Sequence, residues 1–155
     1  GYYSPISNRI TLYDTGAVSN SPEAWKLNAD TIIHEATHQT AFNTDIHRRF
    51  GNNPKWVVEG LGTLFEAPGV WDSRMHKSRE DRINQGRLEG FKNYLKTSRK
   101  VGSLAEFISS DRIFFQNPSA AYAEAWALTY YLMRSKSDGD PPTAVRRVFT
   151  PNRRA

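Results

Sequence analysis

Two histidines and a glutamate within five residues form the part of this sequence best suited to chemistry. His34, Glu35 and His38 give the pattern H-E-x-x-H. On a helix, residues four apart lie on one face, so both imidazoles can turn toward a single zinc ion. Glu35 then lies where its carboxylate can reach a water on an open position of the metal. The motif predicts a zinc site with a general base beside it.

A catalytic zinc ion usually takes three protein ligands, and Glu59 is the candidate for the third. Twenty residues lie between His38 and Glu59, enough to end one helix, turn, and bring a second helix across the first. Gly60 and Gly62 are poor helix formers. Their presence after Glu59 indicates that this second helix packs closely against the histidine-bearing one. The chain contains no cysteine, so histidines and carboxylates must supply the zinc ligands.

The elements expected to position these residues are mostly helices. A helix is predicted from Trp25 or Asn28 to about Phe42, with Asn28 or Asp30 as its cap. Asn53-Pro54 opens the second helix, which is predicted to reach about Ala67 and to stop at Pro68-Gly69. The other predictions are an irregular lead-in at 1–5, a strand at 9–14, a loop at 15–22, helices at 79–98, 103–109, 117–136 and 143–149, and a break at 137–142.

Length and composition fit one soluble globular domain over residues 1–155. No apolar run approaches the roughly 18–20 residues that cross a bilayer, so no membrane span is expected. The chain begins without Met, and we expect a fragment of a longer precursor. The net charge of +5 is spread over separate arginine pairs rather than one basic stripe, so no nucleic-acid partner is expected. The compartment and the oligomeric state stay open.

With the residues around Glu59 included, the pattern resembles a known group of enzymes. His34-Glu35-x-x-His38 followed by Trp56-x-x-Glu59-Gly60-x-Gly62-x-x-Phe65-Glu66 looks like the gluzincin division of zinc metallopeptidases. Within that division it is most similar to a peptidase MA-like family long catalogued only as a domain of unknown function. The later segment Tyr122-Ala123-Glu124-Ala125-Trp126 also resembles that family, and the resemblance covers roughly residues 2–133.

The resemblance implies a zincin-like catalytic domain of α+β class, mainly helical, with a small sheet. Its edge strand, Ile10–Asp14, would line the cleft and hold an extended peptide by β-augmentation. The implied ligands of one zinc ion are His34, His38 and Glu59, with Glu35 as general base. The implied reaction is hydrolysis of a peptide or protein substrate, with an endopeptidase favoured.

Two further roles follow from the resemblance. Thermolysin-like gluzincins carry an acidic residue four positions after the ligand glutamate, but here that position is Thr63. Glu66 lies one turn further along and is a candidate to orient His34 or His38.

The oxyanion that develops during hydrolysis needs a hydrogen-bond donor besides the metal. Tyr122 is favoured because it opens the segment that matches the family, although Tyr122, Trp126 and Tyr130 also form an ordinary core stripe. The other candidates are Tyr130, His76, expected in a loop, and His47, expected to be solvated beside Arg48-Arg49.

Two other functions stay open. One is a zinc-bound but catalytically inactive binding module that keeps His34, His38 and Glu59; the presence of Glu35 argues against it. The other is a metal-free basic protein that binds an acidic partner through its arginine pairs and aromatics.

Overall fold

The computed structural model describes residues 1–13, 22–134 and 143–149. Within these ranges the chain is mainly helical, with one two-stranded antiparallel sheet. The α+β class expected from the sequence is confirmed at this level. The chain divides into two compact units, one made of residues 1–53 and 61–84, the other of residues 54–60 and 85–155. The expectation of a single domain over 1–155 stays a prediction.

The sheet of the first unit joins β1 (Tyr2–Ser4) to β2 (Arg9–Thr11), with Tyr3 opposite Ile10. The turn between them places Asn8 at φ 56°, a left-handed conformation that asparagine tolerates better than most residues. The predicted irregular lead-in is therefore wrong, because residues 2–4 pair with the expected strand. That strand ends at Thr11 rather than Asp14, and Asp14 lies outside the described residues.

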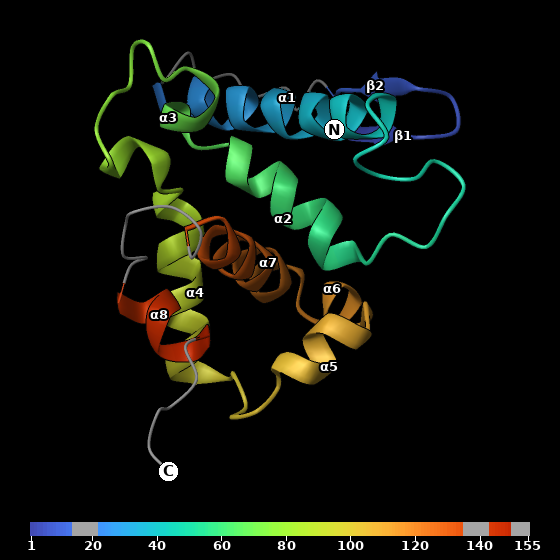
Figure 1. Ribbon diagram of the computed structural model, residues 1–155. Helices are drawn as coiled ribbons and strands as arrows, with labels where there is room; N and C mark the ends of the chain where they lie inside the picture. The colour runs from blue at the N-terminus through green and yellow to red at the C-terminus, as the bar shows by residue number, and fades with distance from the viewer. Residues whose placement is uncertain (14–21, 135–142, 150–155) are drawn as a thin grey trace. The chain divides into compact units, whose positions relative to one another are not determined.

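Helix α1 (Pro22–Asn43) packs against both strands, and Figure 1 shows the hairpin lying along one end of it. The helix begins before the predicted start, with Pro22 in the first position, where its missing N–H costs no hydrogen bond. Asn28 and Asp30 lie inside the helix, so the predicted caps are wrong. The Tyr3 and Phe42 rings, 5.6 Å apart between centroids, join the sheet to the last turns of α1.

Helix α2 (Lys55–Phe65) follows the Asn53-Pro54 signal as predicted and ends two residues before the expected Ala67. Its residues up to Gly60 belong to the second unit and those from Leu61 to the first. Pro68-Gly69 is more than the predicted stop of the helix, because Pro68–Trp71 forms the short helix α3. A Cβ atom at Gly69 would lie 2.7 Å from backbone of the 3-10 helix η1 (Glu80–Arg82), so glycine permits this packing.

The second unit is built around α7 (Pro118–Arg134), whose residues are mostly buried. Helices α4 (Gln85–Thr97), α6 (Arg112–Gln116) and α8 (Thr143–Phe149) pack against it (Figure 1). Helix α5 (Leu104–Ser109) precedes α6. Trp126 is fully buried, and alanines on both sides of it let the neighbouring helices approach closely.

Three helix predictions need correction in this part of the chain. The helix predicted at 79–98 is interrupted, because Ile83 is extended and α4 begins only at Gln85. Helix α6 was not expected. The helix predicted at 103–109 begins one residue later, at Leu104, and the Ser103 hydroxyl before it makes no cap hydrogen bond. The helix at 143–149 is confirmed, while the loop at 15–21, the end of the helix at Lys136 and the break at 137–142 lie outside the described residues.

Among the described residues, none of the helices is both long enough and apolar enough to cross a membrane.

Candidate metal centre

Helix α1 carries the two histidines in its C-terminal half, before its last turn. His34 and His38 are four residues apart and therefore lie on the same face. Both are buried, and their rings meet edge to face with centroids 4.5 Å apart. The spacing predicted from the sequence thus produces a pair of adjacent imidazoles inside the protein.

Helix α2 approaches this pair at Gly62. A Cβ atom at Gly62 would lie 2.7 to 2.9 Å from three atoms of the His34 ring, closer than real side chains come. The predicted close approach to the histidine-bearing helix is therefore confirmed for Gly62. Gly60 serves a different contact, because a side chain there would meet the Ala125 carbonyl oxygen of α7 at 2.8 Å. For Gly60 the prediction is wrong.

Glu59 lies one turn before Gly62 and Thr63 on the same continuous helix. One ligand atom from each of His34, His38 and Glu59 can be chosen so that all three lie within 4.8 Å of one another. Around a tetrahedral zinc ion, ligand atoms at about 2 Å from the metal are roughly 3.4 Å apart. Small side-chain adjustments would close that difference. Two imidazoles and one carboxylate are also a donor set that catalytic zinc uses, so these residues fit the ion.

A chain of hydrogen bonds orients His34 through its Nδ1 atom. Its Nδ1 lies 2.8 Å from Oε1 of Glu66, which leaves Nε2 for a metal. The other Glu66 oxygen accepts a 2.7 Å hydrogen bond from the side-chain amide of Asn84. The same amide donates to the Thr63 carbonyl oxygen at 3.1 Å. The predicted contact between Glu66 and a candidate ligand histidine is confirmed for His34.

Asn84 was not anticipated as part of the site. The sequence placed it inside a long helix, whereas it directly precedes the first residue of α4. Asparagine is a favoured residue at that position, so the Asn84-Gln85-Gly86 sequence contains the missed signal. Its side-chain NH2 donates to Glu66, where it helps to fix the carboxylate that contacts His34.

Glu35, the predicted general base, is buried beside the two histidines on α1. A carboxylate next to a ligand histidine on a helix is the arrangement that the H-E-x-x-H motif requires. Its action as a base stays a prediction.

His47 differs from its expected state, because it is buried rather than solvated. The chain turns after α1, and the His47 backbone N–H donates to the Ala41 carbonyl oxygen at 3.0 Å, which folds the ring against Phe42. Burial lowers the pKa of His47, the nearby His38 lowers it further, and a backbone hydrogen bond with Ile46 opposes the shift. The lowered pKa of His47 favours its neutral form.

Tyr122 lies on α7 in the second unit. Its ring meets Phe114 edge to face at 5.7 Å, and the Arg87 guanidinium lies 5.4 Å from the ring centroid. Tyr130 is buried on the same helix and packs against Trp126. These contacts agree with the core-stripe interpretation, and the catalytic role of Tyr122 stays a prediction.

The remaining predicted residues lie in the first unit. His76 is half-buried in the loop after α3, as expected, and its backbone N–H donates to the Asp72 carbonyl oxygen. The peptide-binding role of β2 stays a prediction.

Comparison with known proteins places the chain in a family without an assigned activity. The family model described as "Protein of unknown function (DUF1570)" matches residues 28–139. This range includes both candidate histidines, Glu59, Glu66 and Asn84. No curated protein and no solved structure matches the chain.

Proposed function

The chain belongs to this DUF1570 family of unknown function, and we propose from the chemistry of the site that it is a zinc-dependent peptidase of the gluzincin type. The observation that carries the proposal is the grouping of His34, His38 and Glu59, whose ligand atoms lie within 4.8 Å of one another. Three side chains are the number that a catalytic zinc site uses while keeping one position for water.

The surroundings of the three ligands support a metal rather than a chance cluster. His34 is held by Glu66 at 2.8 Å, and Glu66 is held by Asn84 at 2.7 Å. Metal-binding histidines typically donate the N–H of their second ring nitrogen to a carboxylate, which fixes the ring and its tautomer. Gly62 leaves room for the ring, so both position and orientation of His34 are determined by its neighbours.

A zinc ion bound by these residues would lower the pKa of a coordinated water and polarise a carbonyl group. Glu35 would accept a proton from the attacking water on its carboxylate and donate it to the nitrogen of the leaving amine. Burial of Glu35 and both histidines keeps bulk water away from that proton transfer.

Under this proposal the helices α1 and α2 form the centre of a zincin-like catalytic domain. The substrate class is a peptide or protein, held along β2 as an added strand. Tyr122 is proposed as the hydrogen-bond donor to the developing oxyanion.

Metal analysis of the purified chain tests the first step of the proposal. We expect one zinc ion per chain, and a loss of most of that zinc in the Glu59→Ala variant. Glu80→Ala is the matched control, because Glu80 is an exposed glutamate in η1 of the first unit. A wild-type chain that binds no zinc after incubation with excess zinc and dialysis would refute the proposal.

A further inference from the structure

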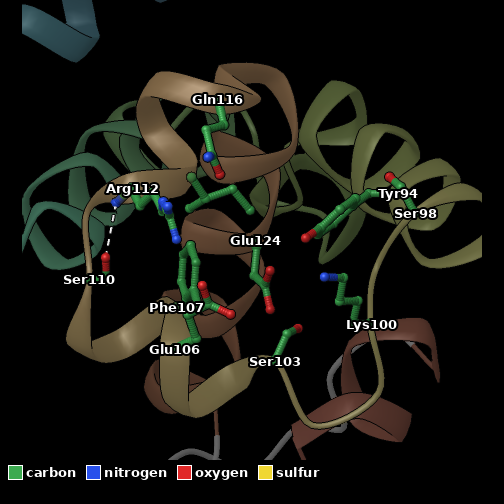
Figure 2. Close-up of a pocket in the computed structure, with 11 residues that line it drawn as sticks. Tyr94, Ser98, Lys100, Ser103, Glu106, Phe107, Ser110, Arg112, Gln116 and Glu124 are labelled. Atoms are coloured by element: carbon green, nitrogen blue, oxygen red, sulfur yellow. Dashed lines mark hydrogen bonds between the residues drawn. The ribbon is translucent and has the colours of Figure 1, made fainter.

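A cavity in the second unit contains a buried carboxylate that the proposed zinc chemistry does not use. The cavity has a volume of about 150 Å³ and is lined by residues from α4 to α7. A volume of this order admits a small molecule of about the size of benzene. Figure 2 shows Glu124 in the middle of the lining, with Ser103, Lys100 and Tyr94 around its carboxylate.

Glu124 is fully buried, and only one of its two carboxylate oxygens is paired within the described part of the chain. Oε1 accepts hydrogen bonds from Arg99, at 2.9 Å from Nε and 2.7 Å from Nη2. Oε2 is buried and has no hydrogen-bond partner. Leaving a buried carboxylate oxygen without a donor is costly, so this atom indicates a place for a ligand's N–H group.

The Ser103 hydroxyl is a second buried polar group in the lining of the cavity. The Ser103 hydroxyl is buried, lacks a hydrogen-bond partner among the described residues, and does not cap α5. Ser103 and Glu124 both line the cavity. The Glu124 carboxylate oxygen and the Ser103 hydroxyl oxygen can both accept a hydrogen bond, which suits a primary ammonium group because it carries three N–H donors.

Two side chains at the rim of the cavity carry a positive charge, opposite in sign to the Glu124 carboxylate. Lys100 and Arg112 line it with exposed side chains, and neither forms an ion pair among the residues that the structure describes. Glu106 adds a second carboxylate, so the four charges on the lining balance. An ammonium group on Glu124 would use one of the two carboxylates, so a ligand that carried only a positive charge would leave Lys100 and Arg112 with Glu106 as their one counter-charge on the lining.

Apolar walls complete the cavity. Phe107 is buried, Ile113 is half-buried, and the ring of Tyr94 lies on the opposite side from Phe107 in Figure 2. These surfaces suit a small aliphatic side chain, which they would remove from water.

We propose that this cavity binds a small zwitterion of the α-amino acid class, with its ammonium group on Glu124 Oε2 and Ser103 Oγ and its carboxylate at Lys100 or Arg112. The aliphatic part would lie against Phe107 and Ile113. The site is separate from the residues of the zinc proposal and does not depend on it.

Calorimetric titration of the full chain with three matched probes tests the assignment. The probes are L-valine, isobutylamine, which lacks the carboxylate, and isovalerate, which lacks the amine. We expect L-valine to bind at least about tenfold more tightly than isobutylamine, because only valine engages the rim cations. Isovalerate should not bind. Equal affinities of valine and isobutylamine, or no binding of valine, would overturn the proposal.

Variants locate the binding on the cavity. Glu124→Gln should weaken valine binding about ten- to a hundredfold, as expected for loss of a charge-assisted hydrogen bond. Because Glu124 also pairs with Arg99, Ser103→Ala provides a second variant that removes no protein hydrogen bond of the hydroxyl, and it should weaken binding about fivefold. Glu89→Gln, at an exposed residue of α4, should bind valine like the wild type. Unchanged affinity in Ser103→Ala and Glu124→Gln would contradict the proposed site.

Amino acids also chelate zinc, so the titration is repeated with Glu59→Ala. We expect unchanged valine binding in this variant. Loss of binding in Glu59→Ala together with retention in Glu124→Gln would assign the valine to the metal centre and overturn the proposal.

Discussion

Glu66 and Asn84 determine how the first candidate ligand is held. Glu66 accepts a hydrogen bond from Asn84 at 2.7 Å and contacts His34 Nδ1 at 2.8 Å. We expect Glu66→Gln to lower zinc affinity about ten- to a hundredfold, as is typical when the group behind a metal-binding histidine is replaced. Asn84→Ala should have a smaller effect in the same direction. Competition with a chromophoric zinc chelator measures both affinities.

The matched control for this prediction is Glu80→Gln, an exposed change in the same unit. It should bind zinc with wild-type affinity. Wild-type affinity in Glu66→Gln as well would show that the hydrogen bond to His34 does not support metal binding.

The two histidines could be identified as candidate ligands from the sequence because their four-residue spacing alone places them on one face of a helix. Identifying His34 and His38 required only that their segment be helical. Identifying Glu59 required a second helix with glycines that allow a close approach. His47 was misjudged because its burial depends on how the turn after α1 folds back on Phe42. The pair of Arg99 and Glu124 was missed because nothing local joins residues 25 positions apart.

At the level of elements, Gly62 is the point where α2 can approach α1. In Gly62→Ala the new Cβ would lie 2.7 Å from the His34 ring, which cannot move without breaking its contact with Glu66. We expect a loss of about 1–3 kcal/mol in the free energy of unfolding, as is typical for overpacking. Zinc affinity should also fall. Urea unfolding and the chelator competition measure the two effects.

Gly90→Ala is the control for this substitution. Gly90 also lies within a helix, but a Cβ atom there would make only an ordinary 3.5 Å contact with Ala123. Because alanine favours helix, this variant should be neutral or more stable by up to about 1 kcal/mol. Equal effects of the two substitutions would show that Gly62 has no special role in helix packing.

The long helices were predictable because their patterns are local. Pro54 and Pro118 lie at or next to the starts of α2 and α7, and the apolar segments that follow are long enough to specify a helix. The sequence missed β1 because its three residues gain a strand conformation only by pairing with β2. The predicted helix at 79–98 began too early because Ile83 fits its apolar pattern. The backbone of Ile83 is extended, so α4 begins only at Gln85.

For the whole molecule, the buried Glu124 predicts a pH dependence of stability. Burial raises the pKa of Glu124 above 4.5, and the hydrogen bond and charge of Arg99 oppose that shift only in part. The folded protein therefore holds this proton more tightly than the unfolded chain. The stability that it contributes is fully present below pH 4.5 and is lost as the pH rises through the folded pKa.

Urea unfolding of the wild type and Glu124→Gln at a series of pH values above 4.5 tests this dependence. The free energy of unfolding of the wild type should fall relative to that of the variant as the pH rises, with a slope of up to about 1.4 kcal/mol per pH unit. A difference between the two proteins that does not change with pH would contradict the raised pKa of Glu124.

Peptide hydrolysis by the zinc-loaded chain, compared between the wild type and Glu35→Gln at equal zinc content, tests the proposed function most directly. Glutamine retains the shape of the side chain but cannot accept the proton. We predict cleavage within a broad peptide library by the wild type, and a rate roughly 100- to 10,000-fold lower in Glu35→Gln. Zinc-loaded wild type that cleaves no peptide, or cleavage that is equally fast in Glu35→Gln, would contradict a peptidase mechanism based on Glu35.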